Sequence, residues 1–261
     1  MSAQAENLKL AVLIDSDNVS HAYVKPMLEE IARYGTPTIK RIYGDWTQPN
    51  ATGWKNVLLE NAITPIQQYS YTSGKNSTDS ALIIDAMDLL YSERVGGFCI
   101  VSSDSDFTRL ATRLREAGML VIGIGEKKTP APFIAACDRF VFLEIIASKP
   151  EPEEDKSESE EKKKKSEPQK PQRPKVPKDI RQLVRNSAND VADEDGWAFL
   201  GEVGTMILRK NPAFDSRNYG YSKLSEFVKS LGFFEVDKRA TSNPGIKHIY
   251  IRDVNFAQSD K

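Results

Sequence analysis

Two pairs of aspartates stand where strands of a parallel sheet are expected to end. Asp15 and Asp17 follow the apolar run LAVLI, and Asp104 and Asp106 follow the run FCIVSS. Such short, mostly β-branched runs are typical of buried parallel strands. Because ligands of open α/β sheets bind beyond the carboxyl ends of the strands, the four carboxylates are expected to meet there. A divalent cation would relieve their mutual repulsion, so the pattern indicates a metal-dependent phosphoryl-transfer site.

A third acidic element lies between the two pairs, in the segment GKNSTDSALIIDAMDLL. Ser77 or Thr78 is expected to cap a helix, which places Asp79 in the first turn with its carboxylate toward the strand ends. Asp85 lies roughly 120° further round the same helix and is a candidate for a supporting role. Asp88 is expected to face solvent.

The elements that must position these side chains alternate along residues 8–146. The alternation of strands and helices with short links predicts an α/β, three-layer sandwich around a mostly parallel sheet. The expected strands cover residues 8–14, 38–43, 64–69, 97–102, 120–124 and 139–143, and the expected helices cover residues 22–34, 53–61, 79–92 and 107–117.

The composition changes abruptly after the first domain, which we place at residues 1–148. Residues 149–178 contain no Leu, Ile, Phe, Trp or Tyr. Such a segment cannot bury enough apolar surface to offset chain entropy, so we predict a disordered, charged and proline-rich linker. Prolines at every third position in its second half favour extended polyproline II, which is typical of a semi-rigid spacer.

Residues 179–253 are expected to form a second compact domain, followed by a tail at residues 254–261. Helical patterns cover residues 180–192, 199–209 and 221–230, and strand patterns cover residues 233–236 and 246–251. Three helices followed by a small hairpin are typical of an α+β winged helix-turn-helix domain.

The bulk composition limits the classes of function. The 261-residue chain has a formal net charge of −1, and no long segment is strongly basic, so nucleic acid must be contacted by local patches. Two cysteines and two histidines form neither a zinc pattern nor a disulfide framework. The apolar runs are far shorter than a membrane span, and no signal-peptide pattern is present. We therefore expect a cytoplasmic protein that does not enter a membrane.

The first domain resembles the NYN domains of the PIN-like nuclease superfamily (LabA-like). The matching pieces are IDSDN with Asn18, Lys75 followed four residues later by Asp79, VSSDSDF, and GMLVIGIG. The resemblance implies a metal-dependent, endonucleolytic ribonuclease. Its catalytic and metal-binding residues would be Asp15, Asp79, Asp104 and Asp106, with Mg²⁺ or Mn²⁺ as the cofactor.

Three further residues are implied as contacts of the substrate. Asn18 would orient Asp15 or a bound phosphate, and Lys75 would hold a phosphate oxygen beside Asp79. Ser103 stands where the family usually has glycine, and its hydroxyl would be a further donor to phosphate.

The IDSDN segment also resembles the opening motif of haloacid-dehalogenase phosphatases, in which the first aspartate attacks phosphorus. The VSSDSDF segment would then supply the later acidic pair. The domain has no evident cap module, however, and Asp79 at a helix start would have no role. This alternative therefore ranks behind the nuclease and behind a catalytically inactive, RNA-binding adaptor.

Residues 179–252 resemble the OST-HTH, or LOTUS, domain through the Trp197–Leu200 entry, NYGYSKLSEFV and the final strand IYIR. The resemblance implies RNA binding or docking of a protein partner. Basic residues for phosphate and aromatic residues for base stacking suit RNA, although Tyr221 is also a core candidate. The proposed RNA contacts are Arg209, Lys210, Arg217, Tyr219, Tyr221 and Lys223.

Together these features predict a ribonuclease that is tethered to an RNA-binding domain. Tethering would raise the concentration of bound RNA at the acidic site. A homo-oligomer is compatible with the same sequence.

Overall fold

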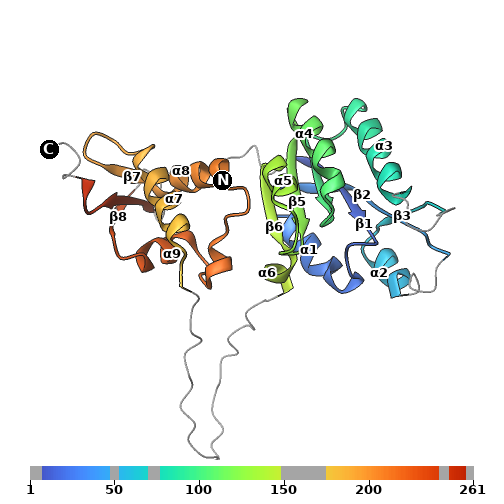
Figure 1. Cartoon of the computed structure of the whole chain (residues 1–261), viewed down its shortest axis with the longest axis horizontal. Coiled ribbons are helices and arrows are strands. Elements are labelled where there is room, and N and C mark those ends of the chain that lie inside the picture. Colours follow the sequence, from blue (N-terminus) through green and yellow to red (C-terminus); the bar gives the residue numbers. More distant parts are fainter. Residues whose placement is uncertain (1–7, 48–52, 70–76, 148–174, 241–246, 257–261) are drawn as a thin grey trace, which may run out of the picture. The chain divides into compact units, whose positions relative to one another are not determined.

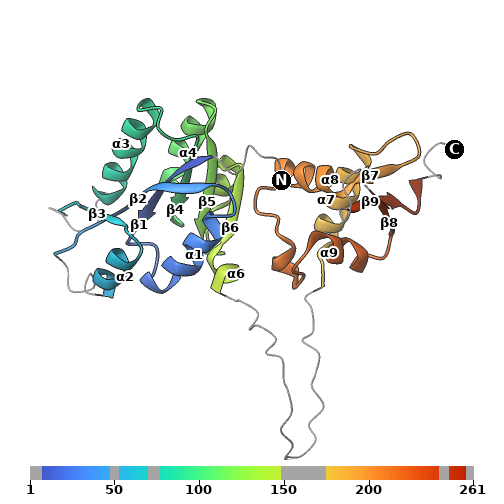
Figure 2. The ribbon, with the colours of Figure 1, turned by 180° about the vertical axis from the view of Figure 1, so that it is seen from behind.

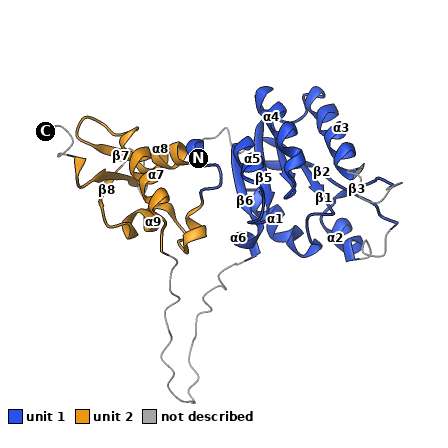
Figure 3. Ribbon diagram, viewed as in Figure 1, with its two compact units in different colours: residues 1–147, 208–214 blue, residues 148–207, 215–261 orange. Residues whose placement is uncertain are grey.

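The computed structural model describes residues 8–47, 53–69, 77–147, 175–240 and 247–256. The chain divides into two compact units, one of residues 1–147 with 208–214 and the other of residues 148–207 with 215–261 (Figure 3). Most of the predicted linker, residues 149–174, lies outside the described residues. The helix that follows it begins at Lys178.

The first unit is built on a six-stranded sheet in which every neighbouring pair of strands is parallel. The strand order is β3-β2-β1-β4-β5-β6. This confirms the predicted α/β class and all six predicted strands. The strands are β1 (Lys9–Asp15), β2 (Thr36–Gly44), β3 (Thr64–Gln67), β4 (Gly97–Val101), β5 (Leu120–Gly125) and β6 (Arg139–Phe142).

Helices cover both faces of this sheet, as the alternating pattern predicts (Figures 1 and 2). The side chains of β1 alternate, so that Leu13 joins α3, α4 and α5 in one core, whereas Val12 joins α1, α2 and α6 in the other. The helices are α1 (Val24–Ile31), α2 (Trp54–Glu60), α3 (Ser77–Tyr91), α4 (Thr108–Glu116), α5 (Ala131–Ala136) and α6 (Leu143–Ala147). Sequence analysis did not predict α5 and α6, because helices of six and five residues are too short to show a clear helical period.

The strand order reverses direction between β1 and β4. The chain moves from β1 outward to β2 and β3, and then returns to β4 on the other side of β1. The connections on the two sides therefore diverge at the carboxyl ends of β1 and β4. In open α/β sheets this switch point is the place where ligands bind.

The second unit packs three helices against a small antiparallel sheet, which confirms the predicted α+β class. The sheet has the order β7-β9-β8, so β7 adds a strand to the predicted hairpin. Sequence analysis missed β7 because three residues are too short for an alternating pattern. The elements are α7 (Lys178–Asn189), β7 (Trp197–Phe199), α8 (Leu200–Lys210), a 3-10 turn (Ser216–Tyr219), α9 (Leu224–Ser230), β8 (Phe234–Ala240) and β9 (Lys247–Asp253).

Within the described part of the chain, no helix combines the length and the apolar character needed to cross a bilayer.

Candidate functional site

Asp15, the last residue of β1, is fully buried at the switch point. Its carboxylate accepts three hydrogen bonds, from the Asp17 backbone N–H at 3.0 Å, the Asn18 side-chain amide at 2.6 Å and the Ser102 hydroxyl at 2.9 Å. Burial raises the pKa of Asp15, and the hydrogen bonds partly oppose this increase. The bond from Asn18 is compatible with the predicted role of orienting Asp15, which stays a prediction.

The segment after β4 brings the second acidic pair to the same edge. Asp104 caps a 3-10 turn (Ser105–Phe107), where its side chain accepts the Asp106 backbone N–H at 2.9 Å. Ser102 links the two strand ends, because its hydroxyl donates to Asp15 and accepts the Asp104 backbone N–H at 3.1 Å. The serine thereby fixes the position of Asp104 relative to β1.

Ser103 is buried, and its hydroxyl accepts the Glu126 backbone N–H at 2.9 Å. This bond ties the end of β4 to the loop after β5. The side chain that replaces the family's glycine is thus used inside the protein, and the predicted phosphate contact gains no support from this position. Lys75, the other predicted phosphate ligand, lies outside the described residues.

Asp79 lies in the first turn of α3, as predicted, and completes an acidic cluster with Asp104 and Asp106. One carboxylate oxygen from each of the three residues lies within 4.8 Å of the others. Desolvation raises the pKa of Asp79 to about 6, with further contributions from the negative charges of Asp15, Asp104, Asp106 and Asp17. A cation bound beside Asp79 would favour the ionised form of this carboxyl group.

This acidic cluster, Asp79, Asp104 and Asp106, fits a divalent cation. Its donors are half-buried or exposed carboxylates, which are the hard oxygen ligands that Mg²⁺ and Mn²⁺ prefer. Asp15 does not belong to the three residues that converge in this way. Its buried carboxylate is linked to the Asp104 backbone through Ser102, and its negative charge contributes to the raised pKa of Asp79.

A second acidic position on α3 is neutralised by the protein. Asp85 accepts hydrogen bonds from the Arg41 guanidinium and the Tyr43 hydroxyl, both on β2. The bond to Asp85 raises the pKa of Arg41, and burial together with Asp85 raises the pKa of Tyr43. Sequence analysis suggested Asp85 as a supporting residue but did not identify this pair of partners.

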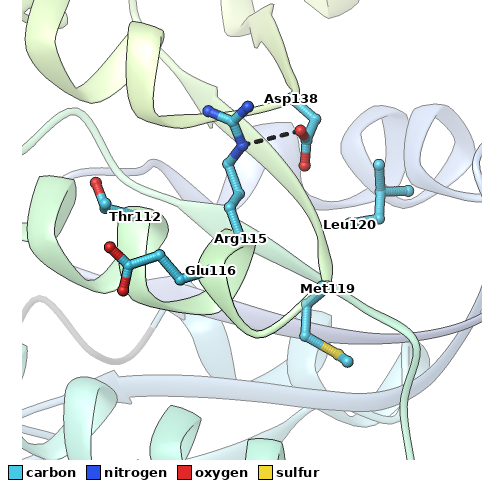
Figure 4. Close-up of a pocket in the computed structure, with 7 residues that line it drawn as sticks. Thr112, Arg115, Glu116, Met119, Leu120 and Asp138 are labelled. Atoms are coloured by element: carbon cyan, nitrogen blue, oxygen red, sulfur yellow. Dashed lines mark ion pairs between the residues drawn. The ribbon is translucent and has the colours of Figure 1, made fainter.

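A hollow lined by Arg115, Leu120 and Asp138 lies at the other edge of the sheet, where β5 and β6 begin (Figure 4). Arg115 forms an ion pair with Asp138 at 2.9 Å, and Asp138 also accepts the Val121 backbone N–H at 2.9 Å. These side chains are engaged in holding α4 and the strand starts together. The convergent carboxylates, rather than this hollow, therefore define the candidate site.

The six RNA contacts predicted from the resemblance to the OST-HTH domain occupy different environments. Arg209, Lys210 and Lys223 are exposed. Arg217 forms an ion pair with Asp215 at 2.7 Å, and Tyr221 is buried with its ring edge-on to Phe227. Tyr219 is half-buried and also packs on Phe227. Arg217, Tyr219 and Tyr221 thus have evident structural roles.

Sequence analysis did not find an array of aromatic and arginine side chains on one face of the small sheet. The Arg239 guanidinium lies over the rings of Trp197 and Tyr250, at 5.1 and 4.1 Å from their centroids. The Arg252 guanidinium lies 4.8 Å from the Trp197 centroid. Cross-strand register brings these residues together, and register cannot be derived from spacing along the chain alone.

Comparison with protein families finds a matching family model for each of two parts of the chain. The model of the NYN domain matches residues 9–144. The chain belongs to the NYN domain family. The model of the OST-HTH/LOTUS domain matches residues 173–246, so the NYN domain is followed by an OST-HTH/LOTUS domain. The acidic cluster belongs to the NYN domain, whose family is PIN-like and nuclease-related.

Solved structures similar to parts of this NYN and OST-HTH chain come from three organisms. A protein of unknown function from Vibrio parahaemolyticus is 19% identical and covers 54% of this chain and 96% of its own, with a TM-score of 0.45. An uncharacterised protein from Nitrosomonas europaea is 30% identical (37% and 91% covered, TM-score 0.29). A Chromobacterium violaceum protein is 34% identical (28% and 78% covered, TM-score 0.24). Among curated proteins, none matches.

Proposed function

We propose that this protein is a metal-dependent ribonuclease whose active site is the acidic cluster of the NYN domain. The observation that carries the proposal is the convergence of Asp79, Asp104 and Asp106 at the switch point of the sheet. The elevated pKa of Asp79, about 6, supports it, because burial and then the negative charges of Asp15, Asp104, Asp106 and Asp17 disfavour the ionised carboxyl, which a bound cation would favour. The family match supports a nuclease rather than another metal-dependent activity.

The three carboxylates would hold Mg²⁺ or Mn²⁺, which would polarise the scissile phosphodiester and lower the pKa of an attacking water. The protein's own contribution is positioning. Ser102 bridges Asp15 and the Asp104 backbone, and the helical turn at Asp79 presents the third carboxylate. The buried Asp15 and the half-buried Asn18, which donates to it, would support the metal ligands.

The OST-HTH domain would supply affinity for RNA. Arg209, Lys210 and Lys223 are the predicted contacts that remain exposed, so they suit phosphate binding. An acidic catalytic domain attracts RNA poorly, and a tethered binding domain would compensate by raising the local RNA concentration. We expect the protein to act in the cytoplasm, consistent with its two free, buried cysteines.

Cleavage of end-labelled single-stranded and structured RNAs in Mg²⁺, Mn²⁺ or EDTA tests the proposal. Asp104→Asn should abolish metal-dependent cleavage, because it removes one of the three converging carboxylates. Asp88→Asn is the matched control, since Asp88 is exposed on α3 and outside the cluster. Equal rates for wild type and Asp104→Asn would place the activity elsewhere or in a contaminant.

An RNA-binding adaptor without catalytic activity is the second candidate. It would bind RNA in all three conditions and cleave it in none. We do not propose the phosphatase alternative, because Asp15, its nucleophile, is fully buried and accepts three hydrogen bonds.

A further inference from the structure

An aromatic group lies at the carboxyl edge of the six-stranded sheet, beside the strands that carry the acidic site. Trp46 follows β2, Trp54 begins α2, and His21 follows β1. The rings of Trp46 and Trp54 meet edge to face with centroids 6.5 Å apart, and those of His21 and Trp54 do so at 5.9 Å. Trp54 is buried, Trp46 is half-buried and His21 is exposed, so the group runs from the core to the surface.

Trp46 is held by the end of β3. Its indole N–H donates to the Ile66 carbonyl at 3.0 Å, and its backbone N–H donates to the Gln67 side chain at 3.0 Å. Gln67 in turn donates to Asp45 at 2.9 Å. An indole that is fixed at its polar edge presents a flat ring in one orientation, which lowers the entropy lost when another ring stacks on it.

The benzene ring of Trp46 lies near Gly44, the last residue of β2. A Cβ atom added at Gly44 would come 2.1 Å from the Ser16 hydroxyl and 3.8 Å from Cζ2 of Trp46. The Ser16 hydroxyl and the indole therefore both lie near Gly44, and the hydroxyl occupies the space that a Cβ atom would need. Ser16 directly follows Asp15, and its backbone N–H donates to the Tyr43 carbonyl at 3.1 Å.

Trp46 and the acidic cluster thus lie on opposite faces of one short stretch of sheet edge. Asp15 belongs to the face covered by α3, because it continues the alternation of Ala11 and Leu13. Trp46 packs with the core on the other face. A chain that crosses the edge at β1 and β2 would meet carboxylates on one side and an aromatic ring on the other.

We infer that Trp46, with the Ser16 hydroxyl nearby, forms a stacking subsite for an unpaired nucleobase, so that the substrate is single-stranded RNA. The inference rests on the proposed nuclease function. A base inside a duplex is already stacked on both faces, whereas a base in a single strand is free to stack on an aromatic side chain. The phosphate of the same strand would lie toward the acidic cluster, while the Ser16 hydroxyl is placed to bond the sugar or base edge.

The test compares two fluorescent oligomers of equal phosphate number, an oligouridylate and its abasic counterpart, by anisotropy with the full chain in Mg²⁺. All proteins carry Asp104→Asn so that the oligomers stay intact. Adding Trp46→Leu should weaken binding of the oligouridylate about tenfold and leave the abasic oligomer unchanged. Trp46→Phe should retain most of the affinity, and Tyr91→Leu, which removes an exposed aromatic ring near the end of α3, should have no effect.

Photocross-linking of a 5-iodouridine oligomer locates the base directly. Cross-links to the peptide that contains Trp46 support the subsite, whereas cross-links confined to residues 175–256 overturn it. An equal loss of affinity for both oligomers in Trp46→Leu also overturns it, since the ring would then act through structure. Thermal unfolding of each variant shows whether the fold is retained.

The outcomes separate this inference from the proposed function. If Trp46→Leu does not change RNA cleavage by the chain with native Asp104, the proposed nuclease function stands and the proposed subsite is overturned. If Trp46 contributes to base-dependent binding but no metal supports cleavage, the proposed subsite stands and the proposed nuclease function is overturned. Absence of both binding and cleavage overturns both.

Discussion

Asp79 and Asp85 lie six residues apart on helix α3 and have opposite electrostatic surroundings. Asp85 is bonded to Arg41 and Tyr43, so the protein provides its counter-charge. Asp79 is partly desolvated by burial and faces the negative charges of Asp15, Asp104, Asp106 and Asp17, and these raise its pKa to about 6. Both are half-buried acids on one helix. The comparison shows that the role of a carboxylate depends on the residues around it. A carboxylate with positively charged or donating partners stabilises the fold, whereas one among other carboxylates is suited to bind a cation.

Loss of activity is the largest effect that this comparison predicts. Asp79→Asn should reduce metal-dependent cleavage about a thousandfold or more, because it removes a charged metal ligand at the reacting phosphate. Asp85→Asn should change the rate far less in protein that is still folded. The measurement is single-turnover cleavage of a labelled RNA at saturating metal. Similar losses in the two variants would show that Asp79 also acts through structure.

The metal should stabilise the protein through the acidic cluster. At a free Mg²⁺ or Mn²⁺ concentration near 100 times the dissociation constant, binding adds about 2.7 kcal/mol to the free energy of unfolding. Thermal denaturation with metal and with EDTA measures the change. The gain should survive in Asp85→Asn and vanish in Asp79→Asn. A gain that persists in Asp79→Asn would place the metal away from the cluster.

Asp85→Asn should destabilise the fold. The substitution leaves the Arg41 guanidinium without its charged partner and weakens the hydrogen bond from Tyr43. Breaking a fully buried pair costs about 3–5 kcal/mol, and these side chains are 32% and 20% exposed, so we expect a loss of about 2 kcal/mol. Urea unfolding in EDTA measures it. A loss near zero would mean that solvent already screens the pair.

The local parts of this comparison could be predicted from the sequence, and the long-range parts could not. Apolar runs placed the ends of β1 and β4, and a capping pattern placed Asp79 in the first turn of its helix. The partners of Asp85 lie 44 and 42 residues away, on a different strand, and depend on how α3 packs across the sheet. The Ser102 bridge to Asp15 spans 87 residues. Such partners are chosen by tertiary packing, which leaves no local periodicity to detect.

The positions of Ser103 and Trp46 show the same limit. A serine in place of glycine suggested a phosphate donor, but the loop after β5 supplies a backbone N–H that occupies its hydroxyl. In the sequence, Trp46 is one of several residues that follow a strand. Its orientation follows from hydrogen bonds to residues 66 and 67 on β3, 20 and 21 residues further along the chain. Identity and spacing predicted which residues reach the edge of the sheet, whereas the direction of each side chain depended on neighbouring strands.

The smallest predicted effect is a gain in stability when Asp79 is neutralised, which is opposite to the loss expected for Asp85→Asn. In EDTA above pH 7, Asp79→Asn should raise the free energy of unfolding by about 1 kcal/mol, a value that allows for solvent screening around a half-buried carboxyl. The pKa of Asp79 is about 6 in the folded protein, against an ordinary value of 3.8. Between these values the folded state binds more protons than the unfolded state, so this group's contribution to stability falls as pH rises.

The difference between wild type and Asp79→Asn should therefore be nearly constant below pH 4, widen between about pH 4 and 6, and level off above pH 7. Urea unfolding of both proteins across this range in EDTA measures it, with Asp88→Asn as the exposed control. Together with the loss in Asp85→Asn, the result would give opposite signs for one substitution at two sites of one helix. A destabilised Asp79→Asn would mean that the cluster already contains a compensating charge, and the case for a bound cation would lose its electrostatic basis.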